Sequence, residues 1–372
     1  MEKIPILDLK KQIAPMRAEI DAAIKEVIDN TNFILGRQVN ELEEEVKKYL
    51  GVKYAVGCSN GTDAIKLALV AMGIKPGEGV VCPSFTYYAT AGAIASLGAV
   101  PVFCDIEADT YNISPSSLEQ TLRKNKDRLK IKAVVPVHLY GQCADMDKVL
   151  EIAKKYDLKV SEDNAQAFGA EYKGRMAGGI ADCGTTSFFP GKNLGAFGDA
   201  GMVFTNDQII TDNLRILRNQ GNMEKYYHLM LGFNNRLDTL QAAVLKVKLK
   251  YLDGWNKKRA EIAARFNQSF KGLDVKTPFV PGYTTHIYHL YVLRMNGPSD
   301  KLTKHLVDKG IDSRVYYPVP LHLQKCFDDL GYKKGDFPDT EKACIETLAI
   351  PVYPDLTKEQ IDYIVASVKE FF

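Results

Sequence analysis

Residues 52–206 repeat one pattern, in which a short run of β-branched or other apolar residues is followed by turn residues and then by a helical pattern. Strands that are apolar on both sides are typical of a parallel sheet with helices on both faces. The alternation of such strands with helices therefore predicts an α/β fold. The five expected strand cores are residues 54–56, 79–81, 101–103, 133–135 and 159–161.

The pattern changes in the second half of the chain. Residues 236–267 are polar and apolar at helical spacing almost throughout and contain no proline, which predicts one long connecting helix. A strand-like run at residues 289–293, a helix near residues 301–309 and a closing helix from Lys358 then predict a smaller α+β unit.

We therefore expect two domains. Residues 1–250 would contain the N-terminal helices and a large domain with a mainly parallel sheet flanked by helices, and residues 251–372 a smaller C-terminal domain. A chain of 372 residues is long enough for both. Residues 1–50 are helical in pattern and are expected to pack on one of the two domains.

Charge and composition exclude several classes of protein. The 48 basic and 46 acidic residues leave a formal charge of +2, so neither nucleic acid nor a membrane surface is expected as a partner. The 46% hydrophobic and 25% charged fractions are those of an ordinary globular protein. The first five residues lack the pattern of a signal peptide, so we expect a cytoplasmic protein. No metal site is expected, because the seven cysteines form neither a Cys-x-x-Cys pair nor a cluster with histidine.

Several familiar binding motifs are absent from the sequence. It contains no Gly-x-Gly-x-x-Gly, no Gly-x4-Gly-Lys-Ser/Thr and no His-Glu-x-x-His. A dinucleotide-binding domain, a P-loop and a zinc protease site are therefore disfavoured. The remaining candidates are polar residues at the ends of the predicted strands.

The first of these polar sets is residues 59–63, Ser-Asn-Gly-Thr-Asp, between a predicted strand and a predicted helix. Backbone N–H groups at Gly61 and the hydroxyl of Thr62 could hold a phosphate at the positive end of the helix dipole. The alternative is a capped helix start without a ligand. This motif by itself favours the alternative, because capping residues are common.

Asp163 and Lys192 are the other two candidates. Asp163 lies in residues 162–166, Glu-Asp-Asn-Ala-Gln, at the end of a predicted strand, where ligands of open α/β sheets bind. Its alternative is an exposed turn aspartate that caps the next segment. Lys192 lies in a loop framed by Pro190 and glycines between two apolar strands, and its alternative is a solvated surface lysine.

The order and spacing of these features favour one cofactor. Asp163 follows Thr62 by 101 residues, and Lys192 follows Asp163 by 29. A phosphate cradle, an acid and a lysine are the contacts that pyridoxal 5'-phosphate (PLP) needs for its phosphate, its pyridine nitrogen and its aldehyde. Taken together, the three features indicate a PLP site.

With these residues in place, the sequence resembles the DegT/DnrJ/EryC1/StrS family of sugar aminotransferases. The resemblance covers nearly the whole chain and implies the aspartate-aminotransferase-like, or type I PLP, fold. Two positions depart from the family pattern without replacing a chemical group: Asn164, where alanine is usual, and Ala200, where glycine is usual. The matching segments are residues 59–64, 83–87, 138–141, 162–166, 187–195, 234–238, 317–322 and 335–338.

The resemblance implies a role for each site residue. Lys192 would be the catalytic Schiff-base lysine and general base, and Asp163 would keep the pyridine nitrogen protonated so that the ring accepts electrons. Tyr87 would stack on the ring, and Gln166 would approach its 3-hydroxyl. The resemblance also implies a homodimer with shared active sites. The phosphate would be held by Gly61, Thr62, Ser187 and the partner subunit's Asn234.

The reaction that the resemblance implies is transfer of an amino group from L-glutamate to a nucleotide-linked keto-sugar, for surface polysaccharide (lipopolysaccharide or O-antigen) biosynthesis. Residues 226–228 and 232–243 resemble the branch that aminates C3 of UDP-2-acetamido-2-deoxy-3-ketoglucuronate. Residues 286–292 instead resemble relatives that act on dTDP-3-keto-6-deoxyhexoses. An alternative of another class is a non-catalytic regulatory or binding protein on the same fold, and the intact Lys192 and Asp163 argue against it.

Four residues are candidates for contact with the sugar. Arg236 could bind a sugar carboxylate or a nucleotide phosphate, or instead form a structural ion pair with an acid such as Asp238. The other three, for which the alternative is ordinary packing, lie in a turn-rich segment beside Pro318 and Pro320: Tyr316, Tyr317 and His322.

Overall fold

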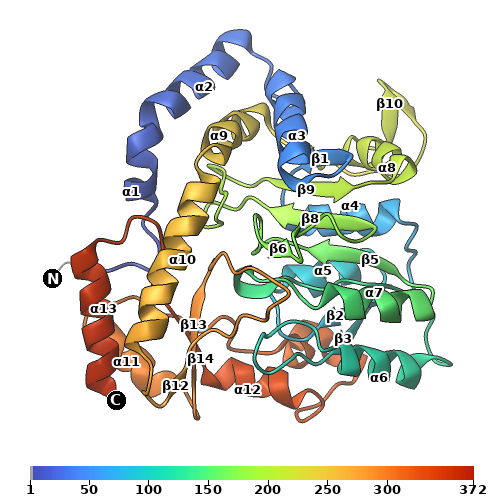
Figure 1. Cartoon of the computed structure of the whole chain (residues 1–372). Helices are drawn as coiled ribbons and strands as arrows, with labels where there is room; N and C mark the ends of the chain where they lie inside the picture. The colour runs from blue at the N-terminus through green and yellow to red at the C-terminus, as the bar shows by residue number, and fades with distance from the viewer. Residues whose placement is uncertain (1–2) are drawn as a thin grey trace.

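The computed structural model describes residues 3–372, and its largest feature is a seven-stranded sheet in the order β1-β9-β8-β5-β4-β2-β3 (Figure 1). All neighbouring strands from β8 to β3 are parallel. This arrangement confirms the predicted α/β fold with a mainly parallel sheet. The strands are β1 (Tyr54–Cys58), β2 (Gly79–Pro83), β3 (Val100–Cys104), β4 (Ile131–Val134), β5 (Lys159–Asp163), β8 (Cys183–Ser187) and β9 (Gly201–Thr205).

One strand of this sheet, β9, runs antiparallel to both of its neighbours, β1 and β8. A loop of turns and bends connects β8 to β9, whereas a parallel pair needs a crossover that usually contains a helix. The register pairs Ser187 at the end of β8 with Gly201, and pairs Gly201 with Cys58 at the end of β1. The ends of β1 and β8 therefore lie on either side of the start of β9.

Side chains alternate between the two faces of the sheet and pack against different helices. On β2, Val80 and Cys82 join a cluster with Ile94, whereas Val81 between them joins a cluster with Val149. This alternation is expected of a strand that is buried on both faces. One face is covered by α4 (Gly61–Ala71), α5 (Ala89–Ser96) and α8 (Gln208–Arg218), and the other by α3 (Arg37–Leu50), α6 (Pro115–Asn125) and α7 (Met146–Lys155).

The N-terminal segment contacts two parts of the molecule, whereas the sequence predicted contact with one. Beside the large sheet, α2 (Arg17–Asn30) and α3 pack against α9 (Thr239–Leu249) (Figure 1). Ahead of α2, the Ile4 N–H donates to Gly310 O at 2.8 Å, and the Asp312 N–H donates to Ile4 O at 2.9 Å. Residues 4–50 therefore link the large sheet to the C-terminal region.

The prediction of a single helix over residues 236–267 is wrong, because two helices, α9 and α10 (Leu252–Ser269), lie there. The Tyr251 N–H donates to Lys248 O at 3.0 Å, a three-residue spacing that tightens the chain where α9 ends. The Tyr251 ring then stacks on Trp255, with ring centroids 6.0 Å apart. The break accompanies side-chain packing that the helical spacing of the sequence does not reveal.

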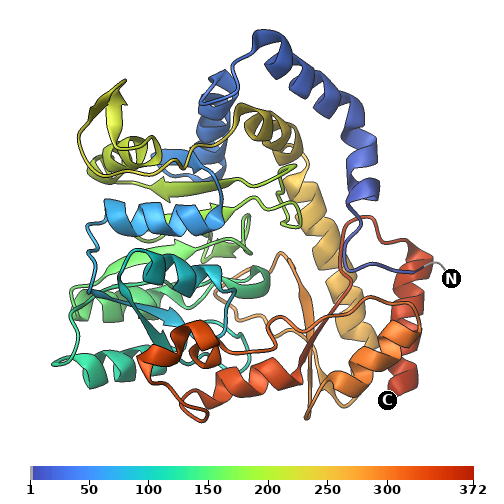
Figure 2. The ribbon, with the colours of Figure 1, turned by 180° about the vertical axis from the view of Figure 1, so that it is seen from behind.

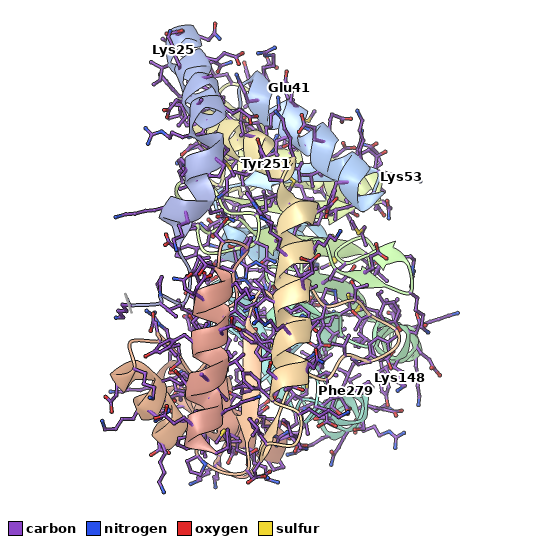
Figure 3. The ribbon with its side chains drawn as sticks, turned by 60° about the vertical axis from the view of Figure 1, so that its left-hand side comes forward. Lys25, Glu41, Lys53, Lys148, Tyr251 and Phe279 are labelled. Carbon is purple, nitrogen blue, oxygen red and sulfur yellow. The ribbon has the colours of Figure 1, made fainter. Side chains whose placement is uncertain are left out.

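A small antiparallel sheet forms the centre of the C-terminal region, where α10 and the closing helix lie side by side (Figure 3). Both chain termini lie in this region (Figure 2). The helices and the sheet share one hydrophobic cluster. The division into two domains after residue 250 stays a prediction. The elements are β12 (Val275–Lys276), β13 (Tyr291–Met295) and β14 (Thr347–Ile350), with α11 (Asp300–Asp308) and α13 (Lys358–Phe371).

The remaining elements are short. A hairpin of β10 (Asn222–Glu224) and β11 (Tyr227–His228) projects from the edge of the molecule near α8 (Figure 1). In the part of the chain that the structure describes, no helix is both long and apolar enough to cross a membrane. The other elements are α1 (Leu9–Ile13), α12 (Pro338–Glu346), β6 (Glu171–Tyr172), β7 (Arg175–Met176), and the 3-10 helices η1 (Ala14–Met16), η2 (Leu139–Gly141), η3 (Leu321–Leu323) and η4 (Lys325–Leu330).

Candidate active site

The polar residues predicted at strand ends meet at one edge of the large sheet. The strands β1, β5 and β8 end at Cys58, Asp163 and Ser187. The register places Asp163 beside Thr185 of β8, and only Gly201 separates Ser187 from Cys58 across the sheet. The topology therefore brings the predicted phosphate cradle, the acid and the start of the lysine loop together.

The loop after β1 forms a helix start that suits an anion. Asn60 caps α4, because its side chain accepts the Asp63 N–H at 2.8 Å. The N–H groups of Gly61 and Thr62 lie in the first turn, where no helical carbonyl is available to them and the helix dipole is positive. A Cβ on Gly61 would lie 2.6 Å from the Cβ of Ser187, so only glycine permits this close approach. The arrangement suits the predicted phosphate contacts.

Asp163 is 5% exposed, and both of its carboxylate oxygens accept hydrogen bonds. Thr90 Oγ1 of α5 donates to Oδ2 at 2.9 Å, and the Ala165 N–H donates to Oδ1 at 3.1 Å. The backbone is held as well, since the His138 N–H donates to Asp163 O at 2.9 Å. This burial excludes the alternative of an exposed turn aspartate and leaves a fixed carboxylate that can pair with a protonated pyridine nitrogen.

Lys192 lies in the loop between β8 and β9, where its N–H donates to Phe189 O at 2.8 Å. Its side chain is partly enclosed by protein. Burial lowers the pKa of the Lys192 amine to about 8, and the negative charge of Asp163 acts in the opposite direction. A lysine with this pKa is partly neutral near physiological pH, as a nucleophile and a general base both require.

Gln166, Tyr87 and Tyr317 form one connected group beside the acid. Gln166 Oε1 accepts the Tyr140 N–H at 2.8 Å, and its Nε2 donates to Tyr317 Oη at 2.8 Å. The rings of Tyr87 and Tyr317 have centroids 5.9 Å apart, and Tyr87 is 58% exposed. Tyr317, which is predicted to contact the sugar, thus directly contacts Gln166 and Tyr87, which are predicted to bind the cofactor.

The structure does not bring His322 into this group. His322 is 2% exposed, with Nδ1 2.7 Å from Ser84 Oγ and Nε2 3.2 Å from Glu341 Oε1. Both ring nitrogens therefore already have partners within the chain, and burial lowers the pKa of the imidazole. Tyr316, the remaining tyrosine, is half-buried, and its carbonyl accepts the hydroxyl of Tyr140.

Asn234 and Arg236 follow the β10–β11 hairpin. Asn234 is exposed in the single chain, and its backbone pairs with Asn219 at the end of α8. Arg236 is half-buried, and its Nε is buried without a hydrogen-bond partner. Within residues 3–372 it forms no ion pair with Asp238 or any other acid, so the structural ion pair considered as an alternative is not made.

Sequence reasoning missed the residues that hold the site in place. Thr90, the hydrogen-bond donor to Asp163, lies in the short helix α5, in which Ser96 is the one other polar side chain. Beside Lys192, Asn193 Nδ2 donates to Asn256 Oδ1 at 2.8 Å, and Asn193 Oδ1 lies 3.1 Å from His289 Nδ1. Burial lowers the pKa of His289 far below its usual value, and the charge of Lys192 adds to this effect. The only sequence signal for Thr90 was a polar residue in an apolar run.

These residues fit PLP. The cradle at Gly61 offers N–H donors to a phosphate, the fixed carboxylate of Asp163 suits a pyridinium, and Lys192 is poised to react with an aldehyde. When bound, the cofactor supplies an electron sink for the carbon that loses a proton. No group of three or more potential metal ligands occurs among the residues described. The fold and the site are those of a PLP-dependent transaminase.

The chain belongs to the DegT/DnrJ/EryC1/StrS aminotransferase family, whose sequence profile matches residues 15–369. It is 44% identical to a pleiotropic regulatory protein of Geobacillus stearothermophilus, over 99% of this chain and 98% of the relative. It is 39% identical to UDP-2-acetamido-2-deoxy-3-oxo-D-glucuronate aminotransferase of Pseudomonas aeruginosa, over 98% of this chain and 99% of the relative. It is also 39% identical to dTDP-3-amino-3,4,6-trideoxy-alpha-D-glucose transaminase of Streptomyces venezuelae, over 99% and 96%.

Solved structures agree with this membership. DesV of S. venezuelae, in complex with a ketimine intermediate, superposes with a TM-score of 0.96 at 38% identity, over 100% of this chain and 99% of that chain. NtdA of Bacillus subtilis with bound cofactor PMP superposes with a TM-score of 0.90 at 30% identity, over 100% of this chain and 85% of that chain. Members of this family use PLP, and the chain is accordingly a PLP-dependent sugar aminotransferase.

Proposed function

We propose that this enzyme aminates C3 of UDP-2-acetamido-2-deoxy-3-ketoglucuronate, with L-glutamate as the donor, for surface polysaccharide biosynthesis. The observation that carries the proposal is the buried Nε of Arg236, which has no hydrogen-bond partner within the chain as described. A guanidinium with free donors suits the carboxylate that distinguishes a glucuronate from a glucosamine. The P. aeruginosa relative, which is named for this substrate, supports the same choice.

The main alternative substrate is a dTDP-3-keto-6-deoxyhexose, which has no carboxylate. The S. venezuelae relative is named for a dTDP-linked sugar and is as similar in sequence, at 39% identity, as the P. aeruginosa relative. With such a substrate, Arg236 would bind a nucleotide phosphate instead. Sequence identity does not separate the two substrates, so the role of Arg236 becomes the point to test.

In the proposed reaction, Lys192 and Asp163 have different tasks. The neutral amine of Lys192 would hold the cofactor at its aldehyde carbon, and as a free amine it would be the general base for the proton of the donor carbon. Asp163 keeps a proton on the pyridine nitrogen through their opposite charges. Gly61, Thr62 and Ser187 would hold the phosphate, and Tyr87 would stack on the ring.

We also propose that the enzyme works as a homodimer with shared active sites. Tyr87, Phe189 and Phe197 are 58%, 56% and 41% exposed in the single chain. Phe189 and Phe197 lie in the loop that carries Lys192, and Tyr87 precedes α5, whose Thr90 donates to Asp163. Large exposed apolar side chains at one place usually mark a surface that another chain covers. Asn234 is also exposed, which leaves it free to reach the phosphate of the partner subunit.

A regulatory protein without catalysis is the second candidate, because the G. stearothermophilus relative carries a regulatory name. The lowered pKa of Lys192 and the buried carboxylate of Asp163 support a working transaminase instead. Lys192→Ala should abolish the release of 2-oxoglutarate from glutamate and leave the folded protein able to retain cofactor weakly. Normal turnover by this variant would remove Lys192 from the reaction.

A panel of UDP- and dTDP-linked keto-sugars with glutamate tests the substrate proposal. Arg236→Gln should lower kcat/KM for the UDP-linked 3-ketoglucuronate by about ten- to a hundredfold, the effect of one lost hydrogen bond to a charged group. The same variant should act almost normally on the UDP-linked 3-keto-glucosamine, which lacks the carboxylate. Arg236→Lys keeps the charge without the planar fork and should give an intermediate loss. An equal fall on both sugars would assign Arg236 to a phosphate and contradict the proposal.

A further inference from the structure

Three polar side chains on α9 and α10 hold the loop that carries Lys192. They are Gln241, Lys248 and Asn256, spaced by seven and eight residues, which is close to two helical turns. Each makes a hydrogen bond to a different part of the loop. Gln241 Oε1 accepts the Phe197 N–H at 2.8 Å, Lys248 Nζ donates to Gly195 O, and Asn256 Oδ1 accepts Asn193 Nδ2 at 2.8 Å.

Lys248 is the unusual member of this group, because its side chain is charged and only 1% of the residue is exposed. Its Nζ lies 5.7 Å from the centroid of the Phe197 ring and 6.0 Å from that of Trp255. No carboxylate pairs with it in the described part of the chain. Burial lowers the pKa of its amine to about 8. A buried cation without an acid is costly, so its retention calls for a reason beyond packing.

The acceptor of this hydrogen bond lies in the tightest part of the loop. A Cβ on Gly195 would lie 2.3 Å from Pro190 O, so the chain doubles back on itself between these two residues. The Ala196 N–H closes the turn by donating to Phe188 O at 2.8 Å. Lys192 lies inside this turn. The orientation of the Gly195 carbonyl therefore affects the backbone from which the Lys192 side chain extends.

We propose that Lys248 is a positioning residue, whose ammonium holds the Gly195 carbonyl and thereby keeps the turn of residues 190–195 in the conformation that directs Lys192 toward Asp163. This inference rests on the proposed role of Lys192 as the cofactor lysine. It assigns to Lys248 no contact with cofactor or substrate. Its effect on the reaction is transmitted through the backbone of the loop.

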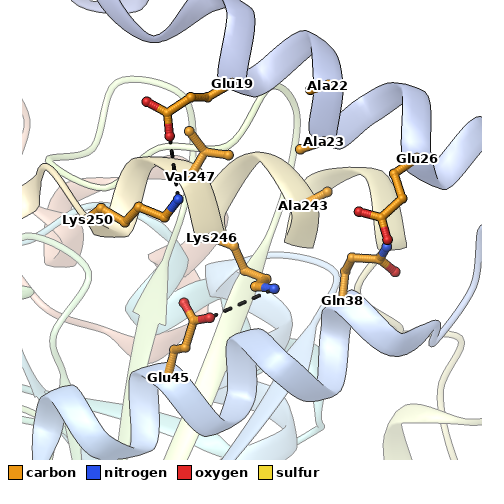
Figure 4. Close-up of a pocket in the computed structure, with 10 residues that line it drawn as sticks. All are labelled: Glu19, Ala22, Ala23, Glu26, Gln38, Glu45, Ala243, Lys246, Val247 and Lys250. Atoms are coloured by element: carbon orange, nitrogen blue, oxygen red, sulfur yellow. Dashed lines mark hydrogen bonds and ion pairs between the residues drawn. The ribbon is translucent and has the colours of Figure 1, made fainter.

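Lys248→Met is the direct test, because methionine fills similar space but cannot donate a hydrogen bond. Lys246→Met is the matched control. Lys246 is two residues away on α9, where it pairs with Glu41 and Glu45. Lys246 and Glu45 lie at the edge of a groove of about 580 Å³ between α2, α3 and α9 (Figure 4). Both variants lose one lysine from the same helix, but only the first loses a contact with the Lys192 loop.

The measurement is hydrogen exchange of the full chain loaded with pyridoxamine phosphate, a form in which the Lys192 amine carries no covalent bond. In Lys248→Met, peptides that cover residues 188–200 should exchange about tenfold faster, as expected for local opening after loss of a charge-assisted hydrogen bond. Peptides from β2 and β4 should be unchanged. In the same variant kcat should fall about tenfold or more with the KM for glutamate nearly constant. Lys246→Met should match the wild type in both measurements.

Lys248→Arg keeps a charged donor and should restore part of both the protection and kcat. If Lys248→Met does not fold, Lys248→Arg becomes the test. Protection of residues 188–200 from exchange in Lys248→Arg then supports the proposal, and loss of that protection overturns the proposal. Unchanged exchange and unchanged kcat in a folded Lys248→Met protein would overturn it as well. A wrong assignment of Lys192 would give a different result, since Lys192→Ala would then be active whereas the exchange of the loop would still depend on Lys248.

Discussion

Lys192 is the candidate catalytic residue whose chemistry burial changes. The amine of Lys192 has its pKa lowered by burial to about 8, from the 10.5 of an ordinary lysine. A lowered pKa in a lysine favours the neutral form, so the reactive amine appears as the pH rises through about 8. The neighbouring carboxylate keeps the pKa from falling further.

A pH dependence follows for the Lys192 amine. The rate at which the cofactor-free chain attaches PLP covalently should rise with pH, with a midpoint near 8, and should level off above it. Absorbance in the near-visible region follows the attachment. The control is a peptide of residues 188–200, in which the same lysine is solvated and should need a pH near 10 to react at half its maximal rate. A rate for the full chain that kept rising to pH 10 would contradict the lowered pKa.

Replacement of Asp163 should weaken cofactor binding and proton transfer together. Asp163→Ala would leave a buried pyridinium without its counter-charge, and breaking a buried ion pair generally costs ~3–5 kcal/mol. Thr90→Val is the milder comparison, since it removes one hydrogen bond to Asp163 and should cost about 1 kcal/mol. Titration of PLP into each variant measures the loss of binding free energy for both substitutions. Cofactor affinity of the wild-type strength in Asp163→Ala would remove this residue from the site.

The chemically active residues could be found from the sequence better than the residues that support them. Lys192 and Asp163 follow strands and are framed by turn residues, so their position at a sheet edge follows from local pattern. Thr90 and Lys248 act across the fold from helices, and no local pattern connects them to the strand ends. For His322, local sequence did not reveal that both ring nitrogens are bonded to Ser84 and Glu341.

At the scale of elements, strands such as β2 and β3 were predictable because their residues are apolar or small and are almost all buried. The break between α9 and α10 was not, because it involves the stacking of Tyr251 on Trp255 and has no proline as a marker. The reversed direction of β9 also depends on how its loop returns to the sheet. Local composition identifies elements, whereas tertiary contacts decide where they bend and which way they run.

A buried ion pair joins three elements just before the phosphate cradle. Arg218 of α8 donates to Glu43 Oε1 of α3 at 2.5 Å and to Gly57 O of β1 at 2.8 Å, and the Gly57 N–H donates to the same Glu43 oxygen at 2.8 Å. Both charged side chains are almost fully buried. Removal of Glu43 would leave the buried guanidinium of Arg218 without its counter-charge.

Glu43→Ala should therefore lower the free energy of unfolding by ~3–5 kcal/mol. The control is Asp21→Ala, which breaks the exposed pair with Arg17 on α2 and should leave the free energy of unfolding almost unchanged. Urea unfolding of both variants measures the difference. The double variant Glu43→Leu/Arg218→Met should recover much of the loss, because it leaves no unpaired charge. Equal stability of Glu43→Ala and Asp21→Ala would show that the pair does not hold these elements together.

At the scale of the whole molecule, the proposed shared sites predict complementation between inactive chains. Lys192→Ala and Asn234→Ala chains, mixed and allowed to exchange subunits, should form heterodimers in which one site has both residues intact and the other has neither. Statistical exchange should recover about a quarter of the wild-type activity, since half of the dimers are mixed and each has one good site. Each variant alone, tested as a homodimer, should be strongly impaired.

Subunit exchange in this experiment is checked independently with two differently tagged chains. Mixed dimers that form but stay inactive would place Lys192 and Asn234 in the site of the same subunit. The proposed homodimer would then have separate active sites.

The pairing of Ile4 with Gly310 and Asp312 has a consequence for the order in which the molecule is assembled. Translation of the roughly 300 residues between them takes on the order of tens of seconds at about 5–20 residues per second. During that time, the nascent N-terminal segment has no partner for its backbone, although α2 and α3 can already form. The backbone of Ile4 is thus synthesised well before the residues with which it pairs. A ribosome that stalls before residue 310 would leave it free for a chaperone or a protease to recognise.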